Sequence, residues 1–369
     1  MIVIGADTHK QTHTCAAVFA ETGGLLGGLT AKARASGFAE LLAWGRALGP
    51  ERVWAIEDCR HVSGSFERHL VAHGERVVRV PQKLMGASRR GERARGKSDA
   101  IDALAVARAA LKEGPQTLPA ARLDERALQI KLLTDHREDL VCARAAEQQR
   151  LRWHLHDLWP ELEIPAGALD RVVWLDRVAR KLARAEQSTR VKIARELVVE
   201  IRRRTRRINE LEREIRALVG DYAPGLLELP GCGPLSAAKI IAETAGAERF
   251  SSDAKFARLA GVAPIPASSG RRDRHRLDPG GNRQLNCALH RIAVTQGRTH
   301  PPARAYLARK RAEGKGKMEA LRCLKRQLAR TVLNRLKQDS IKQAPDQPVM
   351  PESPQTANNP AAIVAPGLT

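Results

Sequence analysis

Apolar residues in the first 113 positions form short runs of strand type, which alternate with stretches of helical periodicity. The runs of strand type cover residues 2–7, 15–19, 25–30, 52–57 and 76–80. Apolar residues that recur every three or four positions predict helices over 36–48, 63–73 and 98–112. The pair Gly23-Gly24 predicts a turn between the second and third strands, and Ser98 is the expected N-cap of the last helix.

This order of elements limits the fold class. Three strands in succession, followed by helix–strand–helix–strand–helix, is the order found in ribonuclease-H-like (RuvC-like) α/β folds. By analogy with them we predict an α/β domain of this class over residues 1–115. The order of the strands in space is not visible in a sequence.

The next hundred residues, 120–219, have the pattern of a helical arm. They are poor in glycine, and a break at 159–167 divides them into two long helices. In the second helix, apolar residues at heptad spacing predict a coiled coil with Arg204 as its one charged interruption; these residues are Leu197, Ile201, Ile208, Leu211, Ile215 and Leu218. A helical hairpin that packs within its own chain explains the pattern equally well.

The last part of the chain contains two segments of different composition. Short helical stretches between Gly/Pro turns predict a mainly α C-terminal domain over residues 225–338. Residues 339–369 are expected to form a disordered tail, because six prolines among Gln, Asn and Ala leave little apolar surface to bury.

The charge of the chain indicates a polyanionic partner. Lys and Arg number 63 against 41 Asp and Glu, which gives a net charge of +22. Aromatic residues make up only 3%, too few for a single-strand binder built on stacking. No apolar run reaches the roughly 18 residues of a membrane span, and the first residues lack the pattern of a signal peptide. The six cysteines are scattered, which favours a reducing cytoplasm. Nucleic acid, not a membrane, is therefore the expected partner.

Four carboxylates stand where a metal site needs them. Asp7 ends the first predicted strand, Glu57 ends the fourth, and Asp99 and Asp102 share one face in the first turn of a helix. Hard divalent cations prefer oxygen ligands, and a pair of them can clamp both oxygens of a phosphodiester displacement. Singly, each position has a simpler explanation in turn formation or the helix dipole. Jointly, they predict a metal site.

These residues also carry a resemblance to a known family. The strings IGADTHK at 4–10, AIE at 55–57 and KSDAIDA at 97–103 resemble the DEDD transposases of bacterial insertion sequences, the insertion sequence one-ten family. The resemblance implies that Asp7, Glu57, Asp99 and Asp102 bind Mg²⁺, or Mn²⁺ in its place. The family often follows the Glu with Ala/Ser-Thr-Gly, whereas Asp58 follows it here and could compete as a ligand.

The C-terminal part contains a second constellation. Gly231 and Gly233, in LPGCG at 229–233, can let backbone N–H groups approach a phosphate, as in a helix-hairpin-helix; a plain helix–helix turn explains them equally well. Further on come LAGVAP at 259–264, SSGRRDRHR at 268–276 and GGN at 280–282. By composition this is a loop with a cationic patch formed by Arg271, Arg272, Arg274 and Arg276.

The same family has these pieces in this order, and its nucleophile is the serine of the Ser-Gly pair. The resemblance therefore implies that Ser269 is a catalytic nucleophile, with Ser268 as a neighbour that is not. Cations close to a serine stabilise the charge of the phosphodiester that it attacks. A second basic cluster just before Asp99 is expected to contact phosphates; it comprises Arg89, Arg90, Arg93, Arg95 and Lys97. His9 and His13 are four apart in predicted strand and turn sequence, where that spacing does not align two ligands.

Three functions follow from the sequence. The first is a DNA transposase or recombinase that cleaves and rejoins strands at element ends and targets, and the resemblance implies guidance by a bridge RNA encoded in the element. The second is a RuvC-like junction endonuclease that uses water. The third is a non-catalytic nucleic-acid-binding protein. We favour the first, acting as a homodimer or homotetramer on the bacterial nucleoid in the cytoplasm.

Overall fold

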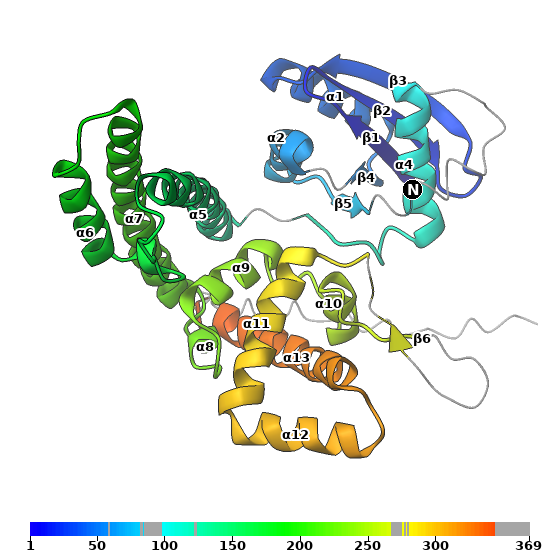
Figure 1. Cartoon of the computed structure of the whole chain (residues 1–369). Helices are drawn as coiled ribbons and strands as arrows, with labels where there is room; N and C mark the ends of the chain where they lie inside the picture. The colour runs from blue at the N-terminus through cyan, green and yellow to red at the C-terminus, as the bar shows by residue number, and fades with distance from the viewer. Residues whose placement is uncertain are drawn as a thin grey trace, which may run out of the picture.

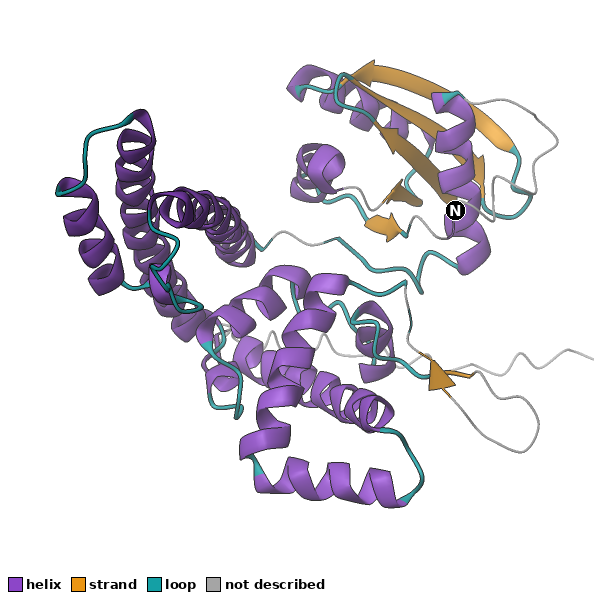
Figure 2. Ribbon diagram, in the orientation of Figure 1, coloured by secondary structure: helices purple, strands orange, loops and turns teal. Residues whose placement is uncertain are grey.

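The computed structural model describes residues 1–57, 60–81, 84, 98–121, 124–266, 275–276, 278 and 280–343. Figure 1 shows an N-terminal α/β part, an arm of long helices and a mainly helical C-terminal part. The strands are concentrated in the N-terminal part, as Figure 2 shows. Among the described residues, no helix is both long enough and apolar enough to cross a membrane.

The N-terminal part contains one five-stranded sheet and three described helices. Its elements are β1 (Ile2–Thr8), β2 (Thr12–Phe19), β3 (Leu25–Lys32), α1 (Ala35–Leu48), β4 (Arg52–Glu57), α2 (Arg60–Ala72), β5 (Val77–Val80) and α4 (Asp99–Glu113). The strand order is β3-β2-β1-β4-β5. The first three strands pair antiparallel, and β4 and β5 run parallel to β1. This is the arrangement expected of a ribonuclease-H-like fold, so the prediction of an α/β domain of this class is supported.

The sheet is covered on both faces because its central strands are apolar on both sides. Along β1, Ile2, Ile4 and Ala6 join the core beneath α1 and α2, whereas Val3 joins the core beneath α4. Alternate residues of a strand point to opposite faces, which accounts for this division. Buried strands of this kind read as continuous apolar runs, and β1 and β4 were predicted from such runs.

A glycine sets how closely α4 lies on the sheet. A Cβ added at Gly5 would stand 2.2 Å from the Ala103 carbonyl oxygen and 2.3 Å from the Ala107 nitrogen. Only a residue without a side chain lets the helix backbone approach β1 so closely. The contact places the first turn of α4 near the end of β1, where Asp7 lies.

A buried carboxylate fixes the opposite end of the sheet. Glu75 accepts hydrogen bonds from Arg52 (2.7 Å), Trp54 (3.0 Å) and Arg46 (3.1 Å). Burial alone would raise the pKa of the Glu75 carboxyl, but these three donors outweigh it and hold the pKa below the ordinary value of 4.5.

Replacing Glu75 by glutamine is therefore expected to destabilise the protein by about 3 kcal/mol, because the substitution leaves a largely buried arginine without its counter-charge. The lowered pKa means that this stabilisation is present at neutral pH and is lost as the pH falls below about 4.5. Chemical unfolding at pH 7 and pH 4 measures both effects. Equal stability of the wild type and Glu75→Gln at pH 7 would refute the assignment of Glu75 as the stabilising counter-charge.

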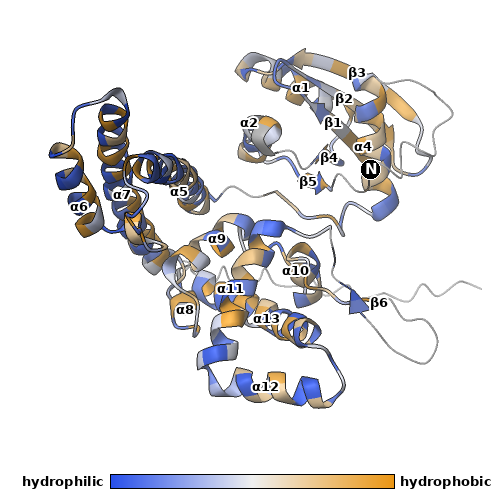
Figure 3. Cartoon of the chain, viewed as in Figure 1, coloured by the Kyte–Doolittle hydropathy of each residue, from blue (hydrophilic) through white to orange (hydrophobic). Residues whose placement is uncertain are grey.

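The arm is a helical hairpin within one chain. It consists of α5 (Glu125–Leu158), the 3₁₀ turn η1 (Ala168–Asp170), α6 (Val172–Ala183) and α7 (Thr189–Tyr222). Two ion pairs link α5 to α7 in antiparallel order, Arg137 with Glu212 (2.8 Å) and Glu147 with Arg204 (2.8 Å). Figure 3 shows hydrophilic residues alternating with hydrophobic ones along these helices. The break near 159 was predicted, but the short helix α6 was not.

The heptad assignment in α7 needs a correction. Its buried face comprises Val191, Ala194, Val198, Ile201, Thr205, Ile208, Leu211, Ile215 and Val219. Leu197 and Leu218, which the pattern placed on that face, are only half-buried. Arg204 lies beside the face and does not interrupt it. The buried face packs against α5 and α6, so the structure has the intramolecular hairpin and not a seam open to a second chain.

The C-terminal part packs its helices around one core. Its elements are α8 (Pro224–Leu227), α9 (Pro234–Thr244), α10 (Asp253–Leu259), β6 (Ile265–Pro266), β7 (His275–Arg276), α11 (Arg283–Thr299), α12 (Pro301–Ala312) and α13 (Lys317–Gln343). Ala127 and Ile130 from the start of α5 join the same core.

The predicted start of the tail at residue 339 is wrong. Helix α13 continues to Gln343, and Asp339 within it is buried, where it accepts a hydrogen bond from the Gly225 N–H (3.0 Å). Residues 344–369 lie outside the described part of the chain.

Candidate active site

The central strands of the sheet bring two acidic residues to the same edge. Asp7 is the next-to-last residue of β1, and Glu57 is the last residue of the parallel strand β4. In the register of this pair Ala6 lies opposite Ile56, so the two acidic residues come next along each strand. The carboxyl ends of parallel strands meet at one edge, and side chains there can project beyond the sheet.

The first turn of α4 adds two more carboxylates. Ser98 caps the helix, with its hydroxyl accepting a hydrogen bond from the Ile101 N–H (3.3 Å), as the sequence predicted. Asp99 is half-exposed and Asp102 is buried. The negative charges of both act on Asp7. Three of the four predicted acidic residues thus lie in one electrostatic cluster, with Glu57 at the end of the neighbouring strand.

A histidine that sequence reasoning set aside belongs to this cluster. The His9 Nε2 atom is 3.1 Å from an Asp7 carboxylate oxygen and 3.5 Å from one of Asp99. The possible ligand atoms of these three residues all lie within 4.8 Å of one another. A signal was present in the sequence, because residues 7 and 9 share one side of an extended chain.

His13 has a different position. It is buried in the core, where its ring stacks on that of Phe38 (5.4 Å) and lies tilted against that of Phe66 (5.2 Å). Burial lowers the pKa of its imidazole. His13 thus lies in the core, whereas His9 lies in the acidic cluster.

The cluster has the electrostatics of a cation site. Burial raises the pKa of the Asp7 carboxyl, nearby His9 lowers it, and the negative charges of Asp102 and Asp99 raise it further, with a net upward shift. A divalent cation would remove this repulsion. Carboxylate oxygens with one imidazole nitrogen suit Mg²⁺ and, better, Mn²⁺. The residues present therefore fit such an ion.

The basic cluster before α4 overlaps a sequence pattern known from nucleotide-binding loops. Residues 91–98, GERARGKS, satisfy the phosphate-loop consensus Gly-x₄-Gly-Lys-Ser. A phosphate loop follows its strand directly, whereas ten residues separate Gly91 from the end of β5 at Val80. The Ser98 hydroxyl, moreover, caps α4. We therefore assign no nucleotide site here.

The five basic residues predicted to contact phosphates lie outside the described residues; they are Arg89, Arg90, Arg93, Arg95 and Lys97.

In the C-terminal part, a short hairpin holds the ends of the predicted Ser-Gly loop. Ile265 pairs with Arg276 and Pro266 pairs with His275, which joins β6 to β7. Arg276 is exposed on β7. The residues between the two strands lie outside the described part of the chain; they include Ser268, Ser269, Arg271, Arg272 and Arg274.

The GGN motif at 280–282 anchors the base of this hairpin. A Cβ on Gly281 would stand 2.2 Å from the Gly261 nitrogen, so both glycines are needed for the close approach of the two backbones. Asn282 caps α11 through the Leu285 N–H (2.9 Å), and its amide group donates to Glu243 (2.6 Å). Glu243 also pairs with Lys131 of α5 (3.0 Å). The arm and the base of the hairpin are thus connected by a partly buried polar network.

The two glycines of LPGCG come just before α9. Gly233 is the N-cap of α9, and Gly231 has φ +80°, a conformation that favours glycine. Both glycines are exposed, and the first helical residue, Pro234, has no N–H to donate. Contact with phosphates remains a prediction for both.

The strand order and the acidic edge are compatible with a ribonuclease-H-like enzyme. Residues 4–160 match the DEDD transposases of IS110, and residues 223–308 match the transposase family IS116/IS110/IS902. The chain is similar to three insertion-element proteins that are described as uncharacterized. The 44.8 kDa protein of IS116 from Streptomyces clavuligerus is 30% identical and aligned over 74% of this chain and 79% of its own length. The 42 kDa protein of IS900 from Mycobacterium paratuberculosis is 27% identical, over 87% of this chain and 92% of its own length. The 43.6 kDa protein of IS110 from Streptomyces coelicolor is 37% identical, over 32% of this chain and 30% of its own length.

The chain belongs to the IS110 family of DEDD transposases. Membership implies an enzyme that cleaves and rejoins DNA and uses divalent metal ions.

Proposed function

We propose that this transposase uses Asp7, Glu57, Asp99 and Asp102 to hold two Mg²⁺ ions, or Mn²⁺ in their place, at the scissile phosphate of DNA. The observation that carries the proposal is the convergence of Asp7, His9 and Asp99, whose ligand atoms lie within 4.8 Å of one another. His9 is an additional ligand candidate. Bound ions would polarise the phosphate and offset the charge that develops on its oxygens.

The protein's own residues carry the other requirements of the site. Gly5 lets α4 lie close to β1, which keeps the Asp99 and Asp102 carboxylates near Asp7. The Ser98 cap holds the first turn of that helix. The cluster needs no large movement to bind a cation, because its donors already lie together.

The second part of the proposal assigns the nucleophile to Ser269. Its hydroxyl oxygen would attack the phosphorus and lose its proton, while the bond to the departing DNA oxygen breaks and that oxygen takes up a proton. The product is a DNA strand joined to serine, which conserves the bond for rejoining. The arginines that follow the serine would stabilise the phosphate under attack; they are Arg271, Arg272, Arg274 and Arg276. His275 lies six residues further on and is the neighbouring base in the sequence.

The remaining parts concern partners. The net charge of +22 suits binding of both DNA and an element-encoded guide RNA. The basic residues before α4, with Gly231 and Gly233, are candidate phosphate contacts. A homodimer or homotetramer would let the acidic site of one subunit act with Ser269 of another on nucleoid DNA. A RuvC-like endonuclease that uses water is the alternative, since the acidic cluster alone serves both reactions.

The test is a cleavage assay with the purified full chain, DNA that carries the element's ends, and the flanking non-coding RNA. We expect strand cleavage in Mg²⁺ or Mn²⁺, little without the RNA, and none in excess chelator, because the acidic cluster requires a cation. Full cleavage in chelator would overturn the metal assignment. Equal cleavage without RNA would overturn the guidance.

A further inference from the structure

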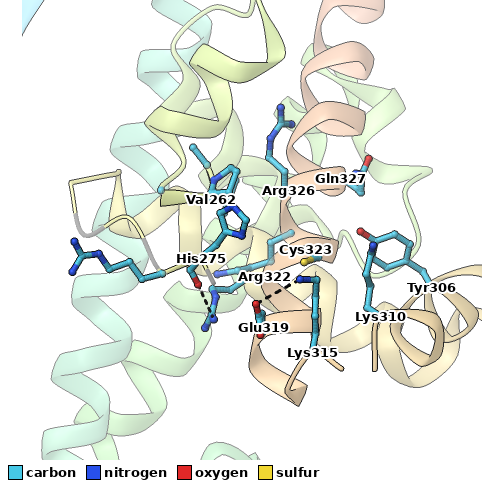
Figure 4. Close-up of a pocket in the computed structure, with 15 residues that line it drawn as sticks. Val262, His275, Tyr306, Lys310, Lys315, Glu319, Arg322, Cys323, Arg326 and Gln327 are labelled. Atoms are coloured by element: carbon cyan, nitrogen blue, oxygen red, sulfur yellow. Dashed lines mark hydrogen bonds and ion pairs between the residues drawn. The ribbon is translucent and has the colours of Figure 1, made fainter. Parts of the chain in front are cut away.

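A cavity of about 260 Å³ lies under the β6–β7 hairpin, between it and helices α12 and α13. Figure 4 shows His275 from the hairpin on one side and residues of α13 on the other. Val262 and Tyr306 contribute less polar walls. The lining contains one carboxylate, Glu319, and six basic residues: Arg276, Lys310, Lys315, Arg322, Lys325 and Arg326.

Three of these six cations are already neutralised. Lys310 pairs with Glu313 (2.7 Å), Lys315 with Glu319 (3.7 Å) and Arg326 with Asp253 (3.1 Å). In the described part of the chain, the other three, Arg276, Arg322 and Lys325, have no carboxylate within 4.0 Å. Among the residues that the structure describes, the lining therefore carries an excess of positive charge on the side that faces the hairpin.

Lys325 is the most informative of the three. Only 5% of its surface is exposed, and its ammonium group donates to the neutral Asn286 amide oxygen (2.8 Å). Burial lowers the pKa of this ammonium, and the positive charge of Arg322 lowers it further. Burying a cation beside a second cation costs free energy that a neutral amide does not return. An anion in the cavity would supply what is lacking.

Arg322 connects the cation pair to the hairpin. Its guanidinium is 3.5 Å from the His275 carbonyl oxygen, a weak contact that leaves most of its five N–H donors for another acceptor. Guanidinium and ammonium groups side by side are the usual donors to a phosphate.

Resting on the proposed function, we propose that this cavity binds a phosphodiester of the substrate DNA strand, held by Arg322 and Lys325. Ser269 is the third residue after Pro266, and a chain of three residues can span at most about 11 Å. One strand of duplex DNA advances about 3.4 Å per nucleotide. The bound phosphate would therefore lie within a few nucleotides of the one attacked, and the cavity would position the strand.

The test measures how the affinity of the full chain for a DNA duplex, taken from the element's end, varies with salt. Lys325→Met and Arg322→Gln should each lower the log–log slope by about one unit, since each removes one phosphate contact. Lys337→Met is the matched control. It lies on the same helix and donates to a neutral carbonyl, that of Phe250 (2.8 Å), outside the cavity, so its slope should equal that of the wild type.

A second measurement distinguishes loss of a phosphate contact from a general loss of stability in the variants. Inorganic phosphate, compared with chloride at equal ionic strength, should raise the melting temperature of the wild type and of Lys337→Met more than that of Lys325→Met. Unchanged DNA slopes in both cavity variants would overturn the inference. So would a slope that changes with an RNA oligonucleotide but not with DNA.

The experiments can refute the cavity proposal and the proposed catalytic function independently of each other. Should the cavity variants bind DNA with unchanged slopes while cleavage still requires metal and Ser269, only the cavity assignment falls. Should cleavage prove independent of metal and Ser269 while the slopes change as expected, the cavity assignment survives as a DNA contact.

Discussion

Replacing Asp7 by asparagine is expected to lower the rate of DNA cleavage by about a thousandfold or more, while nucleic-acid binding stays nearly unchanged. Asp7 is buried at the centre of the cluster, within reach of His9, Asp99 and Asp102. A bound metal ion contributes several kcal/mol to stabilising the transition state, and about 1.4 kcal/mol corresponds to a tenfold change in rate. Asparagine keeps the shape of the side chain but removes the charge that holds the ion.

The control is Asp139→Asn, the same substitution at an exposed position of α5. It should cleave at the wild-type rate. Asp102→Asn should behave like Asp7→Asn. Cleavage by Asp7→Asn within a few-fold of the wild-type rate, at the same metal concentration, would show that the acidic cluster is not the catalytic site.

The second large effect concerns Ser269. Its replacement by alanine should remove every covalent DNA–protein adduct and abolish strand exchange, because no other group would form the phosphoserine bond. Ser268→Ala removes a hydroxyl from the adjacent position and should leave the adduct in place. Denaturing gels of trapped reactions with labelled DNA measure both.

A normal adduct in Ser269→Ala would refute the assigned nucleophile. Cleavage that persists in Ser269→Ala without any adduct in the wild type would favour the endonuclease that uses water. The comparison with Ser268→Ala matters because the two serines are neighbours and either alanine could disturb the loop.

The N-terminal fold could be predicted because its local patterns agree with its global arrangement. The apolar runs of β1 and β4 indicate buried strands, and the Ser98 cap indicates where α4 begins. The spatial order of strands could not be read, since the alternation of residues defines faces but not neighbours. The close approach of α4 at Gly5 was also invisible, because it depends on where another element packs.

The arm shows why a heptad pattern alone is ambiguous. Leu197 stands next to Val198, and Leu218 next to Val219. Either member of each pair fits an apolar spacing of three or four, and the larger leucines were assigned to the buried face. The structure buries the valines, because the face that includes Thr205 runs one position later.

The sequence predicted the acidic residues of the candidate site but not its histidine, His9. Asp7, Asp99 and Asp102 could be grouped because strand ends and helix starts have fixed geometry. The spacing of His9 from His13 gives no sign of a ligand, whereas its spacing of two from Asp7 places both on one side of an extended chain. The cations Arg322 and Lys325 were beyond sequence reasoning, since they come from a helix some fifty residues after the loop.

The most direct test of the central claim is the binding of Mn²⁺ to the purified full chain, followed by electron paramagnetic resonance of the free ion. The wild-type protein and Asp139→Asn should bind Mn²⁺, and Asp7→Asn should bind it at least about tenfold more weakly, since a lost ligand costs no less than a lost supporting contact. Equal Mn²⁺ binding by wild type and Asp7→Asn would contradict the assignment of this cluster as the metal site of the transposase.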